Sequence, residues 1–214
     1  MNRCTDRKKR TSLVCTVFVL ILLFAVPAVT GTEPYSISVP LEDGWNLFST
    51  PVTLQPGSDT LPVIFEGDTQ PDISIILGWN GNSWFIPDQT FKVIPLHAVF
   101  IKTSGGAHAT LTPSQQVSSP PARVLHPGLN LVGPAPAFVA GQFPAQDVES
   151  ALITIEEVAG GLPGYSMVIS PGLGQPGWVY ASGMASRTFL PFRGYWVIME
   201  NSGTLAGFST TPLP

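Results

Sequence analysis

A glycine-rich run offers the first candidate chemistry in this chain. Gly172, Gly174 and Gly177 follow the spacing Gly-x-Gly-x-x-Gly, which in dinucleotide-binding loops lets the backbone approach a pyrophosphate at a helix N-terminus. That chemistry needs a strand before the loop and a helix after it. Pro176 lies inside the run, and residues 178–180 favour a strand. The run therefore predicts a hairpin loop, and we expect no nucleotide or other cofactor.

Three carboxylates on one segment could bind a hard cation. Glu66, Asp68 and Asp72 lie within seven residues, and calcium prefers oxygen ligands of this kind. They lack the ligand spacing of a known calcium loop, so a solvated acidic turn is the favoured interpretation. We keep these three residues as the candidate metal ligands.

Histidines and other acidic residues provide no clear catalytic pattern. His97, His108 and His126 are far apart and lack metal-ligand spacing, which is typical of surface or packing residues. Glu156 and Glu157 both lie on what we interpret as the polar side of a short helix. Because they are adjacent, their side chains point in different directions, which does not favour a pair of catalytic acids. No Gly-x-Ser-x-Gly motif occurs. We therefore expect no catalytic residues and no enzymatic activity. The alternative, a secreted hydrolase of an extracellular polymer, would need two acids in a cleft.

The first residues resemble an export signal. Five basic residues occur before Thr11, and residues 11–32 carry no charge. Pro27 follows the unbroken apolar run over residues 17–26, and small residues come next. This pattern predicts a signal peptide over residues 1–31, cleaved between Ala28 and Gly31. An uncleaved anchor is the alternative, because the uncharged stretch is close to the roughly 20 residues that span a bilayer.

Charge and cysteine content describe what would remain after cleavage. The remainder would carry 5 basic and 13 acidic residues, a formal charge of -8. Its basic residues are scattered singly, so nucleic acid is excluded as an expected partner. Cys4 and Cys15 both lie in the leader, and no Asn-x-Ser/Thr acceptor occurs. These features favour an extracellular or cell-surface protein of a bacterial or archaeal envelope, in contact with a membrane only through its N-terminal segment.

An internal repeat sets the expected architecture. Residues 39–113 match residues 124–212 in pattern. Residues 41–48 and 125–132 each give a turn ending in Gly, then a strand that alternates through an Asn. Near the end of each copy a Pro precedes a strongly β-prone strand, at residues 94–101 and 190–197. We interpret the repeat as an old duplication.

The middle of each copy supplies a short helix and a hairpin. A capping residue and a proline favour a short helix near residues 58–63, and apolar residues at helical spacing do so over residues 146–155. Asn80-Gly81-Asn82 and the stretch 171–177 separate pairs of β-prone segments. The fold class is therefore mainly β, with one short helix per repeat.

The two copies define the domain boundaries. We expect a β module over residues 36–113, a Pro- and Ser-rich linker over 114–122, and a second β module over 123–214. The linker is either a true interdomain linker or a strap across a single body. A module of about 80 residues without disulfides is marginal alone, so we expect the halves to pack as a sandwich or a barrel-like body.

The chain also resembles a known type of module. Residues 44–51, which begin Gly-Trp-Asn-Leu, and residues 193–197, which contain Gly-Tyr-Trp-Val, look like the signatures of β-rich repeat modules in archaeal and bacterial secreted and surface proteins. The first copy keeps the Trp-Asn-Leu and the second keeps the Gly-Tyr-Trp. The resemblance implies an accessory or surface module and carries no catalytic residues.

Aromatic residues at strand positions are the remaining candidates for binding. We expect core packing for most of this group, which comprises Trp45, Trp84, Phe100, Trp178, Tyr195 and Trp196. Trp79, Trp84 and Trp178 are the candidate binding residues if their side chains reach the surface. The sequence therefore predicts a noncatalytic protein for adhesion, glycan or protein binding, or structural spacing.

Overall fold

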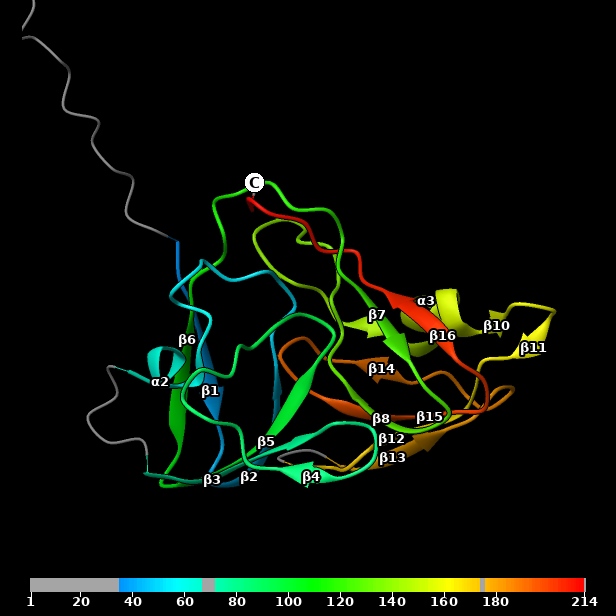
Figure 1. Ribbon diagram of the computed structural model, residues 1–214, viewed down its shortest axis with the longest axis horizontal. Helices are drawn as coiled ribbons and strands as arrows, with labels where there is room; N and C mark the ends of the chain where they lie inside the picture. The colour runs from blue at the N-terminus through cyan, green and yellow to red at the C-terminus, as the bar shows by residue number, and fades with distance from the viewer. Residues whose placement is uncertain (1–34, 67–71, 174–175, 214) are drawn as a thin grey trace, which may run out of the picture. The chain divides into compact units, whose positions relative to one another are not determined.

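Antiparallel strands form most of the regular structure (Figure 1). The computed structural model describes residues 35–66, 72–173 and 176–213, so the leader expected over residues 1–31 lies outside the described residues. No helix in the described part is long and apolar enough to cross a membrane. The mainly β class predicted from the sequence is confirmed.

The first half of the described chain contains one two-stranded sheet and one four-stranded sheet. Strands β1 and β6 pair with each other, and the sheet has the order β2-β5-β3-β4. A four-residue helix, α2 (Leu61–Ile64), follows β2. The strands are β1 (Ile37–Leu41), β2 (Gly44–Ser49), β3 (Asp72–Trp79), β4 (Trp84–Phe85), β5 (Ala98–Ser104) and β6 (Ala107–Leu111).

The second half has the same kinds of pairing. Strands β7 and β16 pair, and the four-stranded sheet has the order β8-β15-β12-β13. Helix α3 (Val148–Leu152) runs into a 3-10 turn at Ile153–Ile155. The strands of these sheets are β7 (Ala122–Leu125), β8 (Gly128–Val132), β12 (Tyr165–Ser170), β13 (Trp178–Tyr180), β15 (Tyr195–Met199) and β16 (Gly203–Ala206). Two small pairs join β9 (Gln146–Asp147) to β14 (Thr188–Phe189) and β10 (Glu157–Val158) to β11 (Leu162–Pro163).

Backbone details recur at aligned positions of the two halves. Gly44 and Gly128 precede their strands with φ of 91° and 96°. Leu96 and Phe192, each one residue after the aligned proline, have φ of 65° and 63°. These residues take the left-handed conformation that L side chains rarely adopt.

Each half supplies most of one apolar core, although Leu96 of the first half lies in the second core and Phe143 of the second half lies in the first. The core of the first half includes Phe48, Val99 and Ile101, while that of the second includes Tyr195 and Val197. A third, small cluster of Leu47, Ala98 and Leu131 draws on both halves. Among the described residues none of the sheets closes into a barrel, so the barrel-like alternative is wrong for this part of the chain.

Backbone hydrogen bonds join the halves directly. The amide of Ser49 donates to the carbonyl of Phe192 at 3.0 Å, and the amide of Gly194 donates to the carbonyl of Leu47 at 3.0 Å. We call this contact, formed by residues 47–49, 96–98, 131–133 and 192–194, the junction. The described chain from Tyr35 onward accordingly forms one compact unit.

The segment between the halves is fastened along its length. The amide of Ser114 donates to the carbonyl of Thr53 at 2.9 Å. Farther along, the amide of Ser118 donates to the carbonyl of Thr211 at 3.0 Å, and the Thr211 hydroxyl donates to the carbonyl of Gln116 at 2.6 Å. Figure 1 shows this green segment running beside the red C-terminal segment. The contacts fit a strap across one body rather than a free linker.

Candidate binding surface

Strand alternation directs several aromatic side chains away from both cores. In β5, Val99 and Ile101 enter the first core, so Phe100 points to the other side of the sheet. In β15, Tyr195 and Val197 enter the second core, and Trp196 points outward. Five such rings form what we call the aromatic face: Trp45, Trp79, Trp84, Phe100 and Trp196.

Trp84 is the centre of the aromatic face. Its ring centroid lies 5.3 Å from that of Trp79, 5.4 Å from Phe100 and 5.7 Å from Trp196. All three neighbours meet it edge to face, at interplanar angles of 65°, 75° and 88° respectively. Edge-to-face geometry is favourable for aromatic pairs. The Trp84 indole is therefore held in a defined orientation by rings from both halves.

The aromatic face is open to solvent and poor in charge. Trp84 is 49% exposed, and the flanking Ile75 and Leu129 are each 41% exposed. None of the five rings carries a charge, and the ammonium of Lys102 lies 5.9 Å from the centroid of the Trp45 ring. The face therefore offers a contact surface of aromatic rings and aliphatic side chains, with one cation at its rim.

A side-chain hydrogen bond ties the face across the junction. Trp79 Nε1 donates to the carbonyl of Leu129 at 2.8 Å. Trp79 comes from β3 of the first half and Leu129 from β8 of the second. The integrity of the face thus depends on how the two halves are held together.

Trp178 is not part of the aromatic face. In the pairing of β12 with β13, Trp178 lies opposite Ser170 and Tyr180 lies opposite Val168. Tyr180 and Val168 belong to the second core. The Trp178 ring stacks on those of Tyr195 and Phe189, at 5.5 and 6.2 Å. Of the three candidate binding residues, the structure brings Trp79 and Trp84 together and places Trp178 on the opposite side of its sheet. One residue of strand register makes this difference.

Core packing is the expectation for most aromatic residues at strand positions. Phe100 and Trp196 are partly buried against the small cluster of Leu47, Ala98 and Leu131, and Trp45 packs edge to face on Phe100. The sequence signal that could have located them is the alternation in β5 and β15, where Phe100 and Trp196 are flanked on both sides by core residues. Which of the two alternating sets faces the core is decided by the layers that pack on each sheet.

The candidate metal ligands are only partly within the described chain. Glu66 follows α2 and is exposed, Asp68 lies outside the described residues, and Asp72 begins β3 opposite Ser104. The part of the chain that the structure describes contains no group of three or more His, Cys, Asp or Glu residues that could hold a metal ion.

The other chemistry-bearing residues are also dispersed. Gly172 and Gly177 lie between β12 and β13, so the run is followed by a strand, while Gly174 lies outside the described residues. Glu156 ends the 3-10 turn and Glu157 begins β10, which corrects the expectation of two acids on one helix face. His126 is exposed, whereas His97 is half-buried at the junction, with Nδ1 3.1 Å from the carbonyl oxygen of Pro95.

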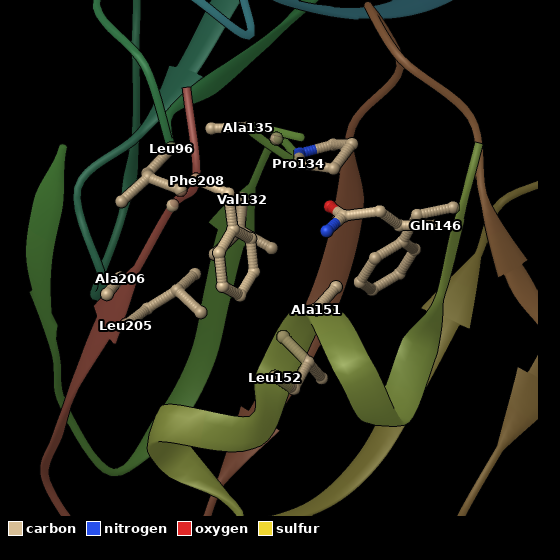
Figure 2. Close-up of a pocket in the computed structure, with 13 residues that line it drawn as sticks. Leu96, Val132, Pro134, Ala135, Gln146, Ala151, Leu152, Leu205, Ala206 and Phe208 are labelled. Carbon is tan, nitrogen blue, oxygen red and sulfur yellow. The ribbon is translucent and has the colours of Figure 1, made fainter. Parts of the chain in front are cut away.

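The described residues also line several small cavities. The cavity in Figure 2 is lined by Leu152, Phe189, Leu205 and other apolar side chains, with Gln146 at one wall, and has room for about one water molecule. Two further cavities, one beside Leu173 and one beside His97, are of similar size. None of the three is lined by a carboxylate.

Comparison of the chain with protein-family models, curated proteins and solved structures finds no match. No relative therefore supplies a ligand or an activity. What the aromatic face can do follows from its own chemistry.

Proposed function

We propose that this chain is a noncatalytic secreted or cell-surface protein that contacts a glycan or protein partner through the aromatic face. The observation that carries the proposal is the half-exposed Trp84, supported edge to face by three other rings. Indole rings supply a large contact area at a low cost in conformational entropy, and rigid aromatic residues dominate many binding surfaces. A ring that is already fixed in the free protein loses little freedom on binding.

The proposed noncatalytic role agrees with the chemistry around the cavities. A hydrolase acting between the halves would need two convergent carboxylates in a cleft. The three cavities have room for one or two water molecules, and no carboxylate lines them. We therefore favour binding over hydrolysis.

We further propose that the two halves descend from one duplicated β module, similar to those in prokaryotic surface proteins. Three features support this: the matching strand orders β2-β5-β3-β4 and β8-β15-β12-β13, the terminal pairs β1-β6 and β7-β16, and the left-handed residues at aligned positions. The buried side chains of Asn46 and Asn130 also make corresponding hydrogen bonds to the turn before each strand.

The proposal of export depends on the basic and apolar leader expected over residues 1–31. Intact mass spectrometry of the protein recovered from the culture medium or from the cell envelope tests it. Loss of residues 1–28 to 1–31 is the expected result. Full-length protein found soluble in the cytosol would contradict the proposal.

Binding is tested with isolated envelopes of the organism that produces the protein. Trp84→Ala should weaken sedimentation of the purified protein with these envelopes at least tenfold, because truncating an anchor residue typically costs about 2 kcal/mol or more. Val117→Ala, at a 90% exposed residue of the strap, is the control and should bind like wild type.

Protease treatment of the envelopes separates the two classes of partner. Binding that survives proteinase K digestion indicates a glycan, and binding that is lost indicates a protein. Equal binding by wild type and Trp84→Ala would exclude the aromatic face as the contact surface.

A further inference from the structure

Four segments meet at the junction with almost no space between them. A Cβ atom at Gly133 would overlap Ser49 Cβ and lie 3.0 Å from the carbonyl oxygen of His97. A Cβ atom at Gly194 would lie 2.6 Å from Leu47 Cγ and 2.6 Å from Ala98 Cβ. Glycine at both positions allows the backbone of the second half to lie directly on the first. A small separation of the segments would therefore break the contact.

A guanidinium group links the halves beside this contact. Arg123 Nη1 donates to the carbonyl of Leu96 at 2.8 Å and to the carbonyl of Leu131 at 2.6 Å. Leu96 belongs to the first half, and Leu131 and Arg123 to the second. The ion pair found within the described residues is that of Lys92 with Asp59. The Arg123 guanidinium is therefore hydrogen-bonded to carbonyl oxygens and is not paired with a carboxylate.

His97 follows Leu96 directly and is half-buried next to Arg123. Its ring lines a small cavity with Phe48, Val99 and Lys92. Arg123 is the charged group that acts on His97, whereas Lys92 lines the same cavity and has its ammonium 2.7 Å from the carboxylate of Asp59. Burial, then the nearby charge of Arg123, lowers the pKa of His97 from 6.5 to about 4.

We propose that His97 makes the junction acid-labile, so that protonation of its imidazole locally opens the contact around Arg123 while the two cores stay folded together. A second cation would then lie beside Arg123 where carbonyl oxygens are the acceptors and no carboxylate compensates. Moving the segments apart hydrates both charges. The proposal concerns the junction and does not require a ligand.

Linkage sets the direction and the size of the effect. In the open form His97 titrates near 6.5, whereas in the closed form it resists protonation until about pH 4. The closed junction is therefore fully stable above pH 6.5 and loses stability as the pH falls from 6.5 towards 4. The ratio of open to closed forms should rise about twenty-fold between pH 7 and pH 5, and about a hundred-fold between pH 7 and pH 4.

Amide hydrogen exchange measured by NMR tests the proposal on the protein after removal of its leader. The amides of Ser49 and Gly194 donate across the junction and report its opening, and the amide of Ile101 in the central strand β5 is the reference. The protection factors of Ser49 and Gly194 should fall about twenty-fold from pH 7 to pH 5, after correction for intrinsic rates, and that of Ile101 should fall less. His97→Gln should abolish this fall.

His126→Gln is the matched control, because His126 is an exposed histidine of the second half. It should retain the pH dependence of the wild-type protein. Unchanged protection at Ser49 and Gly194, an equal loss at Ile101, or the same fall in His97→Gln would each overturn the proposal. An imidazole titration of folded wild type gives an independent check, since a His97 pKa near 6.5 would overturn it without any variant. None of these measurements depends on envelope binding, so they test the junction independently of the proposed function.

Discussion

At the residue scale, one buried asparagine shapes the start of each half. Asn46 is 1% exposed and Asn130 is 3% exposed. Asn46 Nδ2 donates to the carbonyl of Glu42 at 2.7 Å, and Oδ1 accepts from the Glu42 amide at 2.9 Å. Asn130 makes the same pair of bonds with His126, at 2.7 and 3.3 Å. Each side chain thus closes the turn that sends the chain into β2 or β8.

Replacing either asparagine should be costly. Asn46→Ala or Asn130→Ala removes a buried amide together with its hydrogen bonds to the turn before the strand, which should lower the free energy of unfolding by about 1–3 kcal/mol. Urea unfolding followed by circular dichroism measures the change. Asn82→Ala, at an exposed residue of the β3–β4 loop, should change stability by less than about 0.5 kcal/mol. Equal stability of Asn46→Ala and Asn82→Ala would refute the role of the buried amide.

Close contact between the halves also depends on the absence of a side chain at Gly133. Gly133→Ala should destabilise the protein by about 1–3 kcal/mol, because the added methyl group overlaps Ser49. Adding Ser49→Gly removes the overlapping atom, so the double variant should lose less stability than the sum of the single variants. Additive losses in a double-mutant cycle would mean that Gly133 and Ser49 do not touch in solution.

At the element scale, helix α3 depends on its N-terminal residue. Asp147 Oδ1 accepts from the amides of Glu149 and Ser150 at 3.0 and 3.3 Å, and Oδ2 accepts from the Ser186 hydroxyl. The Ser186 hydrogen bond, with the two amide bonds, holds the pKa of the Asp147 carboxyl below its ordinary value. The helix buries Val148, Ala151 and Leu152 in the second core.

Asp147→Ala should lower the free energy of unfolding by about 1 kcal/mol, the usual cost of losing an N-cap. Asp147→Asn keeps an acceptor at the cap and should retain most of the stability at neutral pH. The carboxylate contributes stability above its unfolded-state pKa, and this is lost as the pH falls through its lower folded-state value. Thermal unfolding at pH 7 and pH 3 should therefore show a smaller difference for Asp147→Asn than for wild type.

At the scale of the whole molecule, the two halves should unfold together. The junction shares backbone hydrogen bonds and the cluster of Leu47, Ala98 and Leu131, and the strap is hydrogen-bonded to Thr53 of the first half and to Thr211 of the second. Urea unfolding at pH 7 should give one transition with the same midpoint by tryptophan fluorescence and by far-ultraviolet circular dichroism. Two separated transitions would indicate independent domains.

Either half alone should be unstable. Residues 35–113 would expose Leu47, Ala98 and the aromatic face without their partners, and a domain of this size without disulfides is marginal. We expect this fragment to show no cooperative thermal transition by circular dichroism. A fragment that melts cooperatively, with dispersed NMR signals, would place the stability within each half instead.

The sequence by itself determined the local features of this protein. Alternation of β-prone residues, Gly and Asn at turns, and apolar residues at helical spacing act within a few residues of one another, so the mainly β class, the β3–β4 hairpin and α3 could be predicted. Local patterns do not distinguish a free linker from a strap over residues 114–122, since the partners of this segment lie at Thr53 and Thr211.

Only the tertiary structure decided which aromatic rings meet. Trp178 and Trp196 both lie on strands of the same sheet, yet strand register sends one to the core and the other to the aromatic face. The pairing of Trp79 and Trp84 with Trp196, and the position of His97 beside Arg123, join residues about 25 to 115 positions apart. Such contacts depend on how two sheets pack, and no local pattern of residue types encodes that packing.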